Sequence, residues 1–326
     1  EAILPAGEHS HDDGIETKAP TCGEDGEMTY TCSACGDSYT EAIDATGEHS
    51  YDDSGVCTVC GEVVVQNWNI VLGDDIGVNF ALALTESDEV QVNVDGKKVP
   101  VELIKNEDGT YQVLIEVAAA QMTAEIQIVV NGQPVEKTYS VREYADVILS
   151  GQYDDSVKNL VKNMLAYGGA AQNYFKVNTD NLANQDITVA EAAVPGDDLS
   201  MEILDELDGI NFYGASMILR SKTAVRFYFT AKSVEGLTFT VNGNEYEPDS
   251  AKGMYYVEVA DINPQALADE LNMVVTDGVN NLEVSYSPVT YITRMYHKDG
   301  TSEQLKAVVK AMYGYYLAAQ EYIANV

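Results

Sequence analysis

Apolar residues recur with the period of an α-helix in two long segments, one near the middle of the chain and one at its end. In the first segment, one helical face consists of Val157, Leu160, Val161, Met164, Gly168, Ala171 and Phe175. In the second, the corresponding face consists of Leu305, Val308, Val309, Met312, Tyr316, Ala319 and Ile323. Both patterns predict amphipathic helices of about twenty residues, roughly 30 Å long.

Two adjacent glycines lie inside the first of these helices, where glycine costs about 1 kcal/mol relative to alanine. Gly168 and Gly169 are compatible with a stable helix if their missing side chains have a use. We therefore predict that they let the helix approach its own β-sheet closely.

Short runs rich in β-branched residues precede each helix and predict strands. In the first half of the chain these runs are 63–65, 69–72, 77–84, 90–94, 99–104, 111–117 and 124–130. Asp95-Gly96, Asp108-Gly109 and Asn131-Gly132 stand between strands and favour the tight turns of hairpins. Residues 141–149 predict a short helix directly before the long one.

The same order of strands and helix occurs twice. Val225–Phe229 aligns with Val78–Leu82, and Val241–Gly243 aligns with Val94–Gly96, at an offset of about 147 residues. The long helices align one residue further along. The sequence therefore predicts an α+β fold with two tandem duplicated units, residues 62–184 and 195–326. Each unit is expected to be an antiparallel β-sheet or β-sandwich with a C-terminal amphipathic helix.

All five cysteines precede residue 62, in a segment with few large apolar side chains. Two Cys-x-x-Cys-Gly motifs, starting at Cys32 and Cys57, have the spacing typical of zinc knuckles. Zinc binds thiolate and imidazole ligands in a tetrahedron and stabilises small modules that lack a core. Residues 1–61 are therefore predicted to form a zinc-ribbon-like module. Its candidate ligands are His9, Cys22, Cys32, Cys35, His49, Cys57 and Cys60.

The ligands can be divided in two ways. In one division, a single ion binds both cysteines of each of the two motifs. In the other, each repeat copy binds its own ion, because Gly7–Ser10 recurs about 40 residues later as Gly47–Ser50. The first ion would then take His9, Cys22, Cys32 and Cys35, and the second would take only His49, Cys57 and Cys60. Disulfides are the alternative in an extracellular protein, although an odd number of cysteines argues against complete pairing.

The formal net charge is −35, from 53 acidic and 18 basic residues. Such a charge argues against binding to nucleic acids and to anionic membrane surfaces. No run of eighteen apolar residues is present, so no membrane insertion is expected. No signal peptide is visible. Because Glu1–Ile3 and Gly7–Ser10 read as the tail of an earlier repeat copy, we expect the chain to be part of a longer protein.

Catalytic residues are not apparent. The chain has four histidines, and only His297 lies outside the cysteine-rich module, so a nucleophile activated by histidine is poorly supported. Acidic residues are too numerous to single out a glycosidase pair. Trp68 and the 21 tyrosines offer rigid aromatic surface for recognition of a protein or glycan ligand.

Three stretches of the module, Lys18–Cys22, Thr29–Gly36 and Ala45–His49, resemble repeats that occur in tandem in large proteins of Gram-positive anaerobic bacteria. In those secreted or wall-attached proteins, segments similar to Tyr139–Asp146 and Leu165–Ala183 often follow the repeats. The resemblance covers nearly the whole chain. It implies an extracellular or cell-surface location and a role in adhesion, and it carries no catalytic residues.

The second unit departs from the family pattern, since Pro288 and Tyr316 replace Val141 and Gly168. We therefore expect a non-enzymatic secreted or surface module with an adhesion, binding or spacer role. The alternative is a carbohydrate-binding or carbohydrate-processing module of a surface glycan system.

Overall fold

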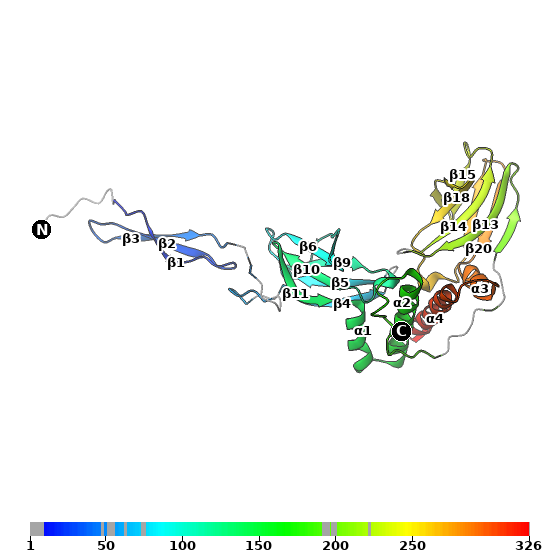
Figure 1. Cartoon of the computed structure of the whole chain (residues 1–326). Coiled ribbons are helices and arrows are strands. Elements are labelled where there is room, and N and C mark those ends of the chain that lie inside the picture. Colours follow the sequence, from blue (N-terminus) through cyan, green and yellow to red (C-terminus); the bar gives the residue numbers. More distant parts are fainter. Residues whose placement is uncertain are drawn as a thin grey trace. The chain divides into compact units, whose positions relative to one another are not determined.

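The computed structural model of the chain describes residues 10–46, 49–50, 56–61, 64–72, 76–190, 196, 201–220 and 223–325. These residues form five β-sheets and four α-helices, which confirms the mixed composition predicted from the sequence (Figure 1). By compactness the chain divides into two units. One comprises residues 1–68, 79–114 and 125–139, and the other comprises 69–78, 115–124 and 140–326. The domain limits inferred from the sequence repeat stay predictions.

The N-terminal module is a three-stranded antiparallel sheet of β1 (Ile15–Lys18), β2 (Gly26–Thr31) and β3 (Ser38–Ile43). Tyr30 of β2 pairs with Tyr39 of β3, and their rings stack with centroids 4.9 Å apart. The turn between β2 and β3 contains the first Cys-x-x-Cys motif. Most side chains of this sheet are exposed, so apolar burial contributes little to its stability.

Eight strands follow the module and form two four-stranded sheets. They are β4 (Val65–Leu72), β5 (Ile76–Leu82), β6 (Val90–Val94), β7 (Lys97–Val99), β8 (Ile104–Lys105), β9 (Tyr111–Glu116), β10 (Ile126–Val130) and β11 (Gln133–Tyr139). The strand orders are β4-β5-β9-β8 and β11-β10-β6-β7. Phe80 of β5 meets Tyr139 of β11 with ring centroids 5.1 Å apart, so the two sheets face each other in a β-sandwich.

Two tight turns of this sandwich form where the sequence predicts them. Asp95-Gly96 and Asn131-Gly132 have positive φ at both residues, as the hairpin turns predicted for them require. The predicted strand 99–104 is wrong. It is replaced by the short strands β7 and β8, because Pro100 has no backbone N–H to donate to a neighbouring strand.

Two helices follow β11: α1 (Val141–Ser150) and α2 (Asp155–Phe175). The side chain of Ser140 caps α1 by accepting a hydrogen bond from the amide of Glu143. Both helices fall where the hydrophobic pattern predicts them. After α2 the chain turns back, and residues 176–190 form turns and irregular structure.

The second set of strands forms a five-stranded and a four-stranded sheet. The strands are β12 (Met201–Asp205), β13 (Ile210–Ile218), β14 (Ala224–Ala231), β15 (Thr238–Val241), β16 (Asn244–Tyr246), β17 (Asp249–Ala251), β18 (Met254–Val259), β19 (Leu271–Thr276) and β20 (Asn281–Tyr286). Their orders are β12-β20-β19-β15-β16 and β13-β14-β18-β17. Phe227 of β14 meets Tyr286 of β20, and Phe229 meets Phe239 of β15, so these sheets also pack face to face.

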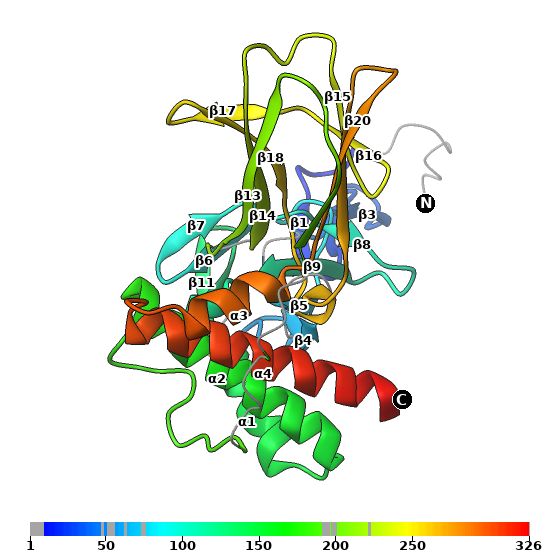
Figure 2. The same ribbon diagram turned by 90° about the vertical axis from the view of Figure 1, so that its right-hand side faces the viewer.

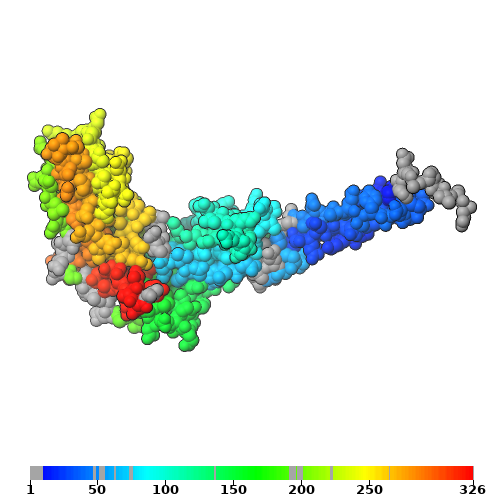
Figure 3. Space-filling view, turned by 180° about the vertical axis from the view of Figure 1, so that it is seen from behind, coloured from blue at the N-terminus to red at the C-terminus, as the bar shows by residue number. Residues whose placement is uncertain are grey.

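The chain ends with α3 (Val289–His297) and α4 (Glu303–Asn325), and α4 packs along α2 (Figure 2). Tyr167 of α2 stacks on Tyr315 of α4, with centroids 6.3 Å apart. Asn159, early in α2, donates a hydrogen bond to Glu321, late in α4. The two helices are therefore antiparallel and meet through the two tyrosines that the sequence repeat aligns. The last turns of α4 reach the surface, where Ile323 is 52% exposed (Figure 3).

The close approach predicted for Gly168 and Gly169 is present, but its partner is not a sheet. A Cβ atom on Gly168 would lie 2.5 Å from Met122 Sδ and 3.2 Å from the carbonyl oxygen of Ala119. These atoms belong to the 3₁₀ turn η1 (Ala119–Gln121) and the residue after it. The helix therefore packs on this turn and on α4, because its buried residues cover more than one helical face.

None of the helices among the described residues combines the length and the hydropathy of a membrane-spanning segment.

Candidate metal centre

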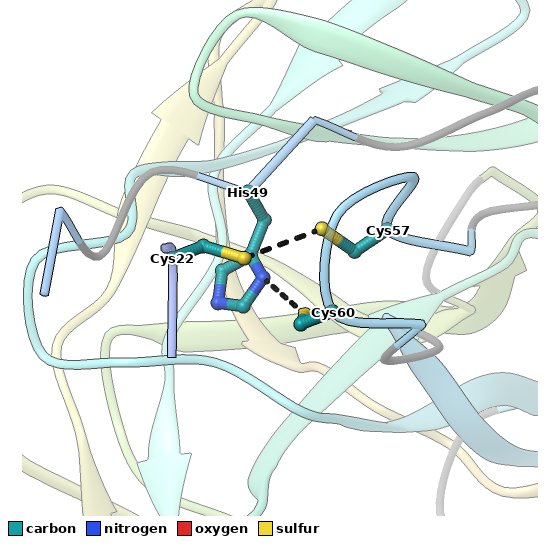
Figure 4. A group of neighbouring side chains, drawn as sticks. All are labelled: Cys22, His49, Cys57 and Cys60. Atoms are coloured by element: carbon teal, nitrogen blue, oxygen red, sulfur yellow. Dashed lines mark hydrogen bonds between the residues drawn. The ribbon is translucent and has the colours of Figure 1, made fainter. Parts of the chain in front are cut away.

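Four side chains converge in the N-terminal module: Cys22, His49, Cys57 and Cys60 (Figure 4). Cys22 lies in the loop between β1 and β2, and His49 follows β3. Cys57 and Cys60 belong to the second Cys-x-x-Cys turn. Among the described residues, this is the one group of three or more histidine, cysteine and acidic side chains close enough to share an ion.

Backbone hydrogen bonds bring the three segments together. The amide of Thr46 donates to the carbonyl oxygen of Thr21 over 2.9 Å, which places the approach to His49 beside the Cys22 loop. The amide of Thr58 donates to the carbonyl oxygen of Ser50 over 2.9 Å, which joins His49 to the Cys57 turn. The ligand positions are thus set by main-chain contacts rather than by a large apolar core.

The Cys57–Cys60 turn closes through Gly61. Its amide donates to the carbonyl oxygen of Cys57 over 2.8 Å, and its φ is +76°. A side chain at this φ would be strained, so glycine is the residue that permits the turn. The motif therefore includes Gly61 for a reason of backbone geometry.

The spacing of the ligand atoms matches a tetrahedral zinc shell. The sulfur atoms of Cys22 and Cys57 are 3.6 Å apart, and Cys60 Sγ is 3.4 Å from His49 Nδ1. Zinc bond lengths place two sulfur ligands about 3.8 Å apart, and a sulfur and a nitrogen about 3.6 Å apart. All four ligand atoms lie within 4.8 Å of one another. Small side-chain rotations would therefore complete the shell.

Burial and local hydrogen bonds act on the thiols in opposite directions. Burial disfavours the thiolate of Cys57, but N–H donors from Cys60, Val59 and His49 outweigh it and lower the pKa to about 5. Burial and the neighbouring thiols of Cys60 and Cys57 raise the pKa of Cys22 to about 12. A bound dication would favour the thiolate of Cys22 as well, so metal binding should release a proton from it.

The ligand set predicts a structural role for the ion. Three thiolates and one imidazole fill a tetrahedron, whereas catalytic zinc keeps one position open for water or substrate. Cys22, His49 and Cys57 are all less than 9% exposed, which shields the centre from solvent. Cys60 is exposed and forms the open side of the group.

The observed group differs from both divisions inferred from the sequence. Cys22 joins the second motif instead of the first, and Cys32 and Cys35 lie outside the group. The reason is strand length. Cys22 precedes β2 and Cys32 follows it, and six extended residues span about 20 Å. His9, the remaining predicted ligand, lies outside the described residues.

The sequence between Cys22 and Cys32 contains a signal that indicates this pairing. Gly26–Thr31 contains Met28 and Tyr30 in strand-like alternation. A strand between Cys22 and Cys32 sends the two cysteines to opposite ends of the sheet. A strand assignment for this segment therefore implies that the two cysteines do not bind the same ion.

Two cavities elsewhere bear on ligand binding. One of about 510 Å³ is lined mainly by apolar residues, with polar groups from Asn69, Tyr144, Gln265, Tyr315 and Tyr322. Another of about 520 Å³ has Glu206 and Asp208 on its wall, and both residues are exposed. The first is the kind of site that could hold a neutral ligand through hydroxyl and amide groups.

The sequence matches no protein-family model and no curated protein sequence. Among solved structures, the chain is similar to a three-immunoglobulin-domain fragment of titin, a glutamate-to-alanine variant. The match has 9% sequence identity and a TM-score of 0.24, and it covers 87% of this chain and 83% of that one.

Proposed function

We propose that the chain is a non-enzymatic module of a secreted or cell-surface protein, in which a zinc-stapled repeat precedes two duplicated sandwich-and-helix units. The carrying observation is the group of Cys22, His49, Cys57 and Cys60, whose spacing suits zinc and leaves no open coordination position. A module whose three strands are mostly exposed needs such a staple to fold. An ordered spacer is the role that this arrangement supports best.

Topology supports the duplication. The sheet β4-β5-β9-β8 corresponds strand by strand to β13-β14-β18-β17, and β11-β10-β6-β7 corresponds to β20-β19-β15-β16. The equivalent tyrosines Tyr167 and Tyr315 meet where the antiparallel helices α2 and α4 cross. Contact between equivalent residues is what a pseudo-two-fold axis between two copies produces. The offset of about 147 residues in the sequence has the same explanation.

The extracellular location rests on the resemblance to proteins of Gram-positive anaerobes. Thiols at a cell surface are normally oxidised to disulfides. Anaerobic surroundings remove that pressure, so a thiolate zinc site can persist outside the cell. The net charge of −35 keeps an exposed spacer soluble.

Metal content of the full chain tests the proposal. Native mass spectrometry should find zinc bound, and substitution of His49→Ala should lower the zinc affinity by at least tenfold, since one of four ligands is lost. His297→Ala is the matched control, because it removes a histidine from α3 and should leave zinc binding unchanged. A purified chain that carries disulfides and takes up no zinc after reduction would overturn the zinc-stapled spacer.

The alternative is a glycan-binding module, which the cavity beside Tyr144, Tyr315 and Tyr322 favours. Tyrosine presents flat apolar surface with a hydroxyl at its tip, which suits sugar rings. A glycan array with the full chain decides between the two. Binding that is lost in Tyr322→Ala would support the alternative, and an array without signal would favour the spacer.

A further inference from the structure

The two Cys-x-x-Cys turns of the module have the same conformation. The amide of Gly36 donates to the carbonyl oxygen of Cys32 over 2.8 Å, and the amide of Gly61 does the same to Cys57 over 2.8 Å. Gly36 and Gly61 have φ values of +78° and +76°. A turn with the geometry of a metal knuckle is therefore present twice, although only the second contributes to the four-residue group.

Burial is distributed alike in the two turns. The first cysteine of each is buried, with Cys32 2% and Cys57 1% exposed, and the second is exposed. Cys32 and Cys35 occupy the same positions in their turn as Cys57 and Cys60 do in theirs. Cys32 and Cys35 can therefore bind one ion together, with Cys35 on the side open to further ligands.

The observed group shows where such ligands come from. Cys57 and Cys60 take their third sulfur from Cys22, in a loop that belongs to the repeat copy before them. That loop is a tight turn in which Thr21 and Glu24 exchange hydrogen bonds, Thr21 N to Glu24 O and Glu24 N to Thr21 Oγ1. The metal centre is thus shared between two consecutive copies, one supplying the loop and the next supplying the turn.

Cys22 cannot serve the Cys32 turn of its own copy. Strand β2 holds the two apart by about 20 Å, and Cys22 is already 3.6 Å from Cys57. Because Cys57 and Cys60 belong to the observed group, a centre at Cys32 and Cys35 with the same three-sulfur shell would take its third sulfur from another copy of the repeat.

We infer that Cys32 and Cys35 form half of a second zinc centre, completed by a Cys22-type loop from another copy of the same repeat. Zinc then joins successive copies head to tail, with each copy donating one loop and accepting one. Because loop and turn are different surfaces, the contact is heterologous and extends a linear array instead of closing a dimer. The inference rests on the zinc-stapled spacer proposed above.

Complementary variants of the full chain test it, with Co²⁺ as the spectroscopic probe for zinc. The donor chain carries Cys32→Ser, Cys35→Ser, Cys57→Ser and Cys60→Ser, and so keeps only Cys22. The acceptor chain carries Cys22→Ser, Cys57→Ser and Cys60→Ser, and so keeps the first turn. The mixture should bind Co²⁺ at least tenfold more tightly than either chain alone, show thiolate-to-cobalt absorption, and sediment as a 1:1 pair.

A donor chain that also carries Cys22→Ser is the control, and it should leave the acceptor monomeric. A mixture whose absorption equals the sum of its parts, and which stays monomeric, would overturn the inference.

A second measurement does not depend on the folding of these variants. The unsubstituted chain should bind a second, weaker equivalent of Co²⁺ that is lost in Cys32→Ser with Cys35→Ser. Failure of the unsubstituted chain to bind even one equivalent would instead refute the first zinc centre.

Discussion

Gln172 offers a sharp test of how the segment after α2 is held in place. Its side chain is fully buried, and Oε1 accepts a hydrogen bond from the amide of Ala183 over 2.6 Å. Its Nε2 donates to Thr123 Oγ1 and to the carbonyl oxygen of Asn181, both over 2.9 Å, and to that of Asn178 over 3.2 Å. One side chain therefore connects α2 to the segment after η1 and to the returning chain.

Gln320 is the matched control, because the sequence repeat aligns it with Gln172. It is exposed and makes one hydrogen bond, from Nε2 to the carbonyl oxygen of Gln265 over 2.9 Å. The same substitution in the two helices thus removes the same atoms from opposite environments. Differences in helix propensity between glutamine and alanine cancel in the comparison.

The expected cost of Gln172→Ala has two parts. The buried amide of Ala183 loses its acceptor, which costs about 1–3 kcal/mol, whereas water can reach the carbonyls of the exposed Asn178 and Asn181. The deleted atoms leave a cavity that adds roughly 1 kcal/mol. We expect a total of about 2–4 kcal/mol for Gln172→Ala and under about 1 kcal/mol for Gln320→Ala. Gln172→Met keeps the volume and should cost only the hydrogen-bond part, about 1–3 kcal/mol.

Hydrogen exchange read by mass spectrometry is the appropriate assay, because a chain with several units need not unfold in one step. Peptides covering residues 178–185 should lose protection by about 30-fold or more in Gln172→Ala, as a loss of about 2 kcal/mol or more implies. Peptides from β14 should be unchanged in all variants. Equal effects of Gln172→Ala and Gln320→Ala, or unchanged exchange of residues 178–185, would refute the reasoning.

Three further predictions concern the helix contact and the metal centre. Gly168→Leu should lower the free energy of unfolding by about 1–3 kcal/mol, because the leucine side chain would overlap Met122 and the carbonyl of Ala119. Urea melts of the variant that match those of the parent chain would contradict this. Chelation with EDTA should remove exchange protection from residues 10–61 but not from α2 or β14, and uniform protection before and after chelation would refute a metal-dependent module. The pKa of Cys57 is lowered to about 5, so this ligand is already a thiolate at neutral pH and competes with protons for zinc only as the pH falls toward 5. The zinc affinity, followed by competition with a chelator, should therefore fall more steeply with pH below about 5 than above it, and an equal slope on both sides would contradict the assignment of a thiolate.

The sequence by itself determined the features that depend on neighbouring residues. The turns at Asp95-Gly96 and Asn131-Gly132 follow from the ease with which these residues adopt positive φ. The helices α1 and α2 follow from apolar residues at helical spacing, and they begin and end close to where that pattern does. The prediction of zinc likewise depends on residue chemistry alone, since thiolates and imidazoles at knuckle spacing suit zinc.

Tertiary structure decided which of these pieces meet. Hydrophobic periodicity marks α2 as buried but does not distinguish a sheet from the η1 turn or from α4 as its partner, since any apolar surface satisfies the same face. At the candidate metal centre, the cysteine motifs predict which residues are ligands but not which of them bind the same ion. Strand β2 separates Cys22 from Cys32. The hydrogen bonds from the amides of Thr46 and Thr58 place Cys22, His49 and Cys57 close together. Distances between ligands distant in sequence depend on how strands pair, and that information lies in contacts between segments instead of in either segment alone.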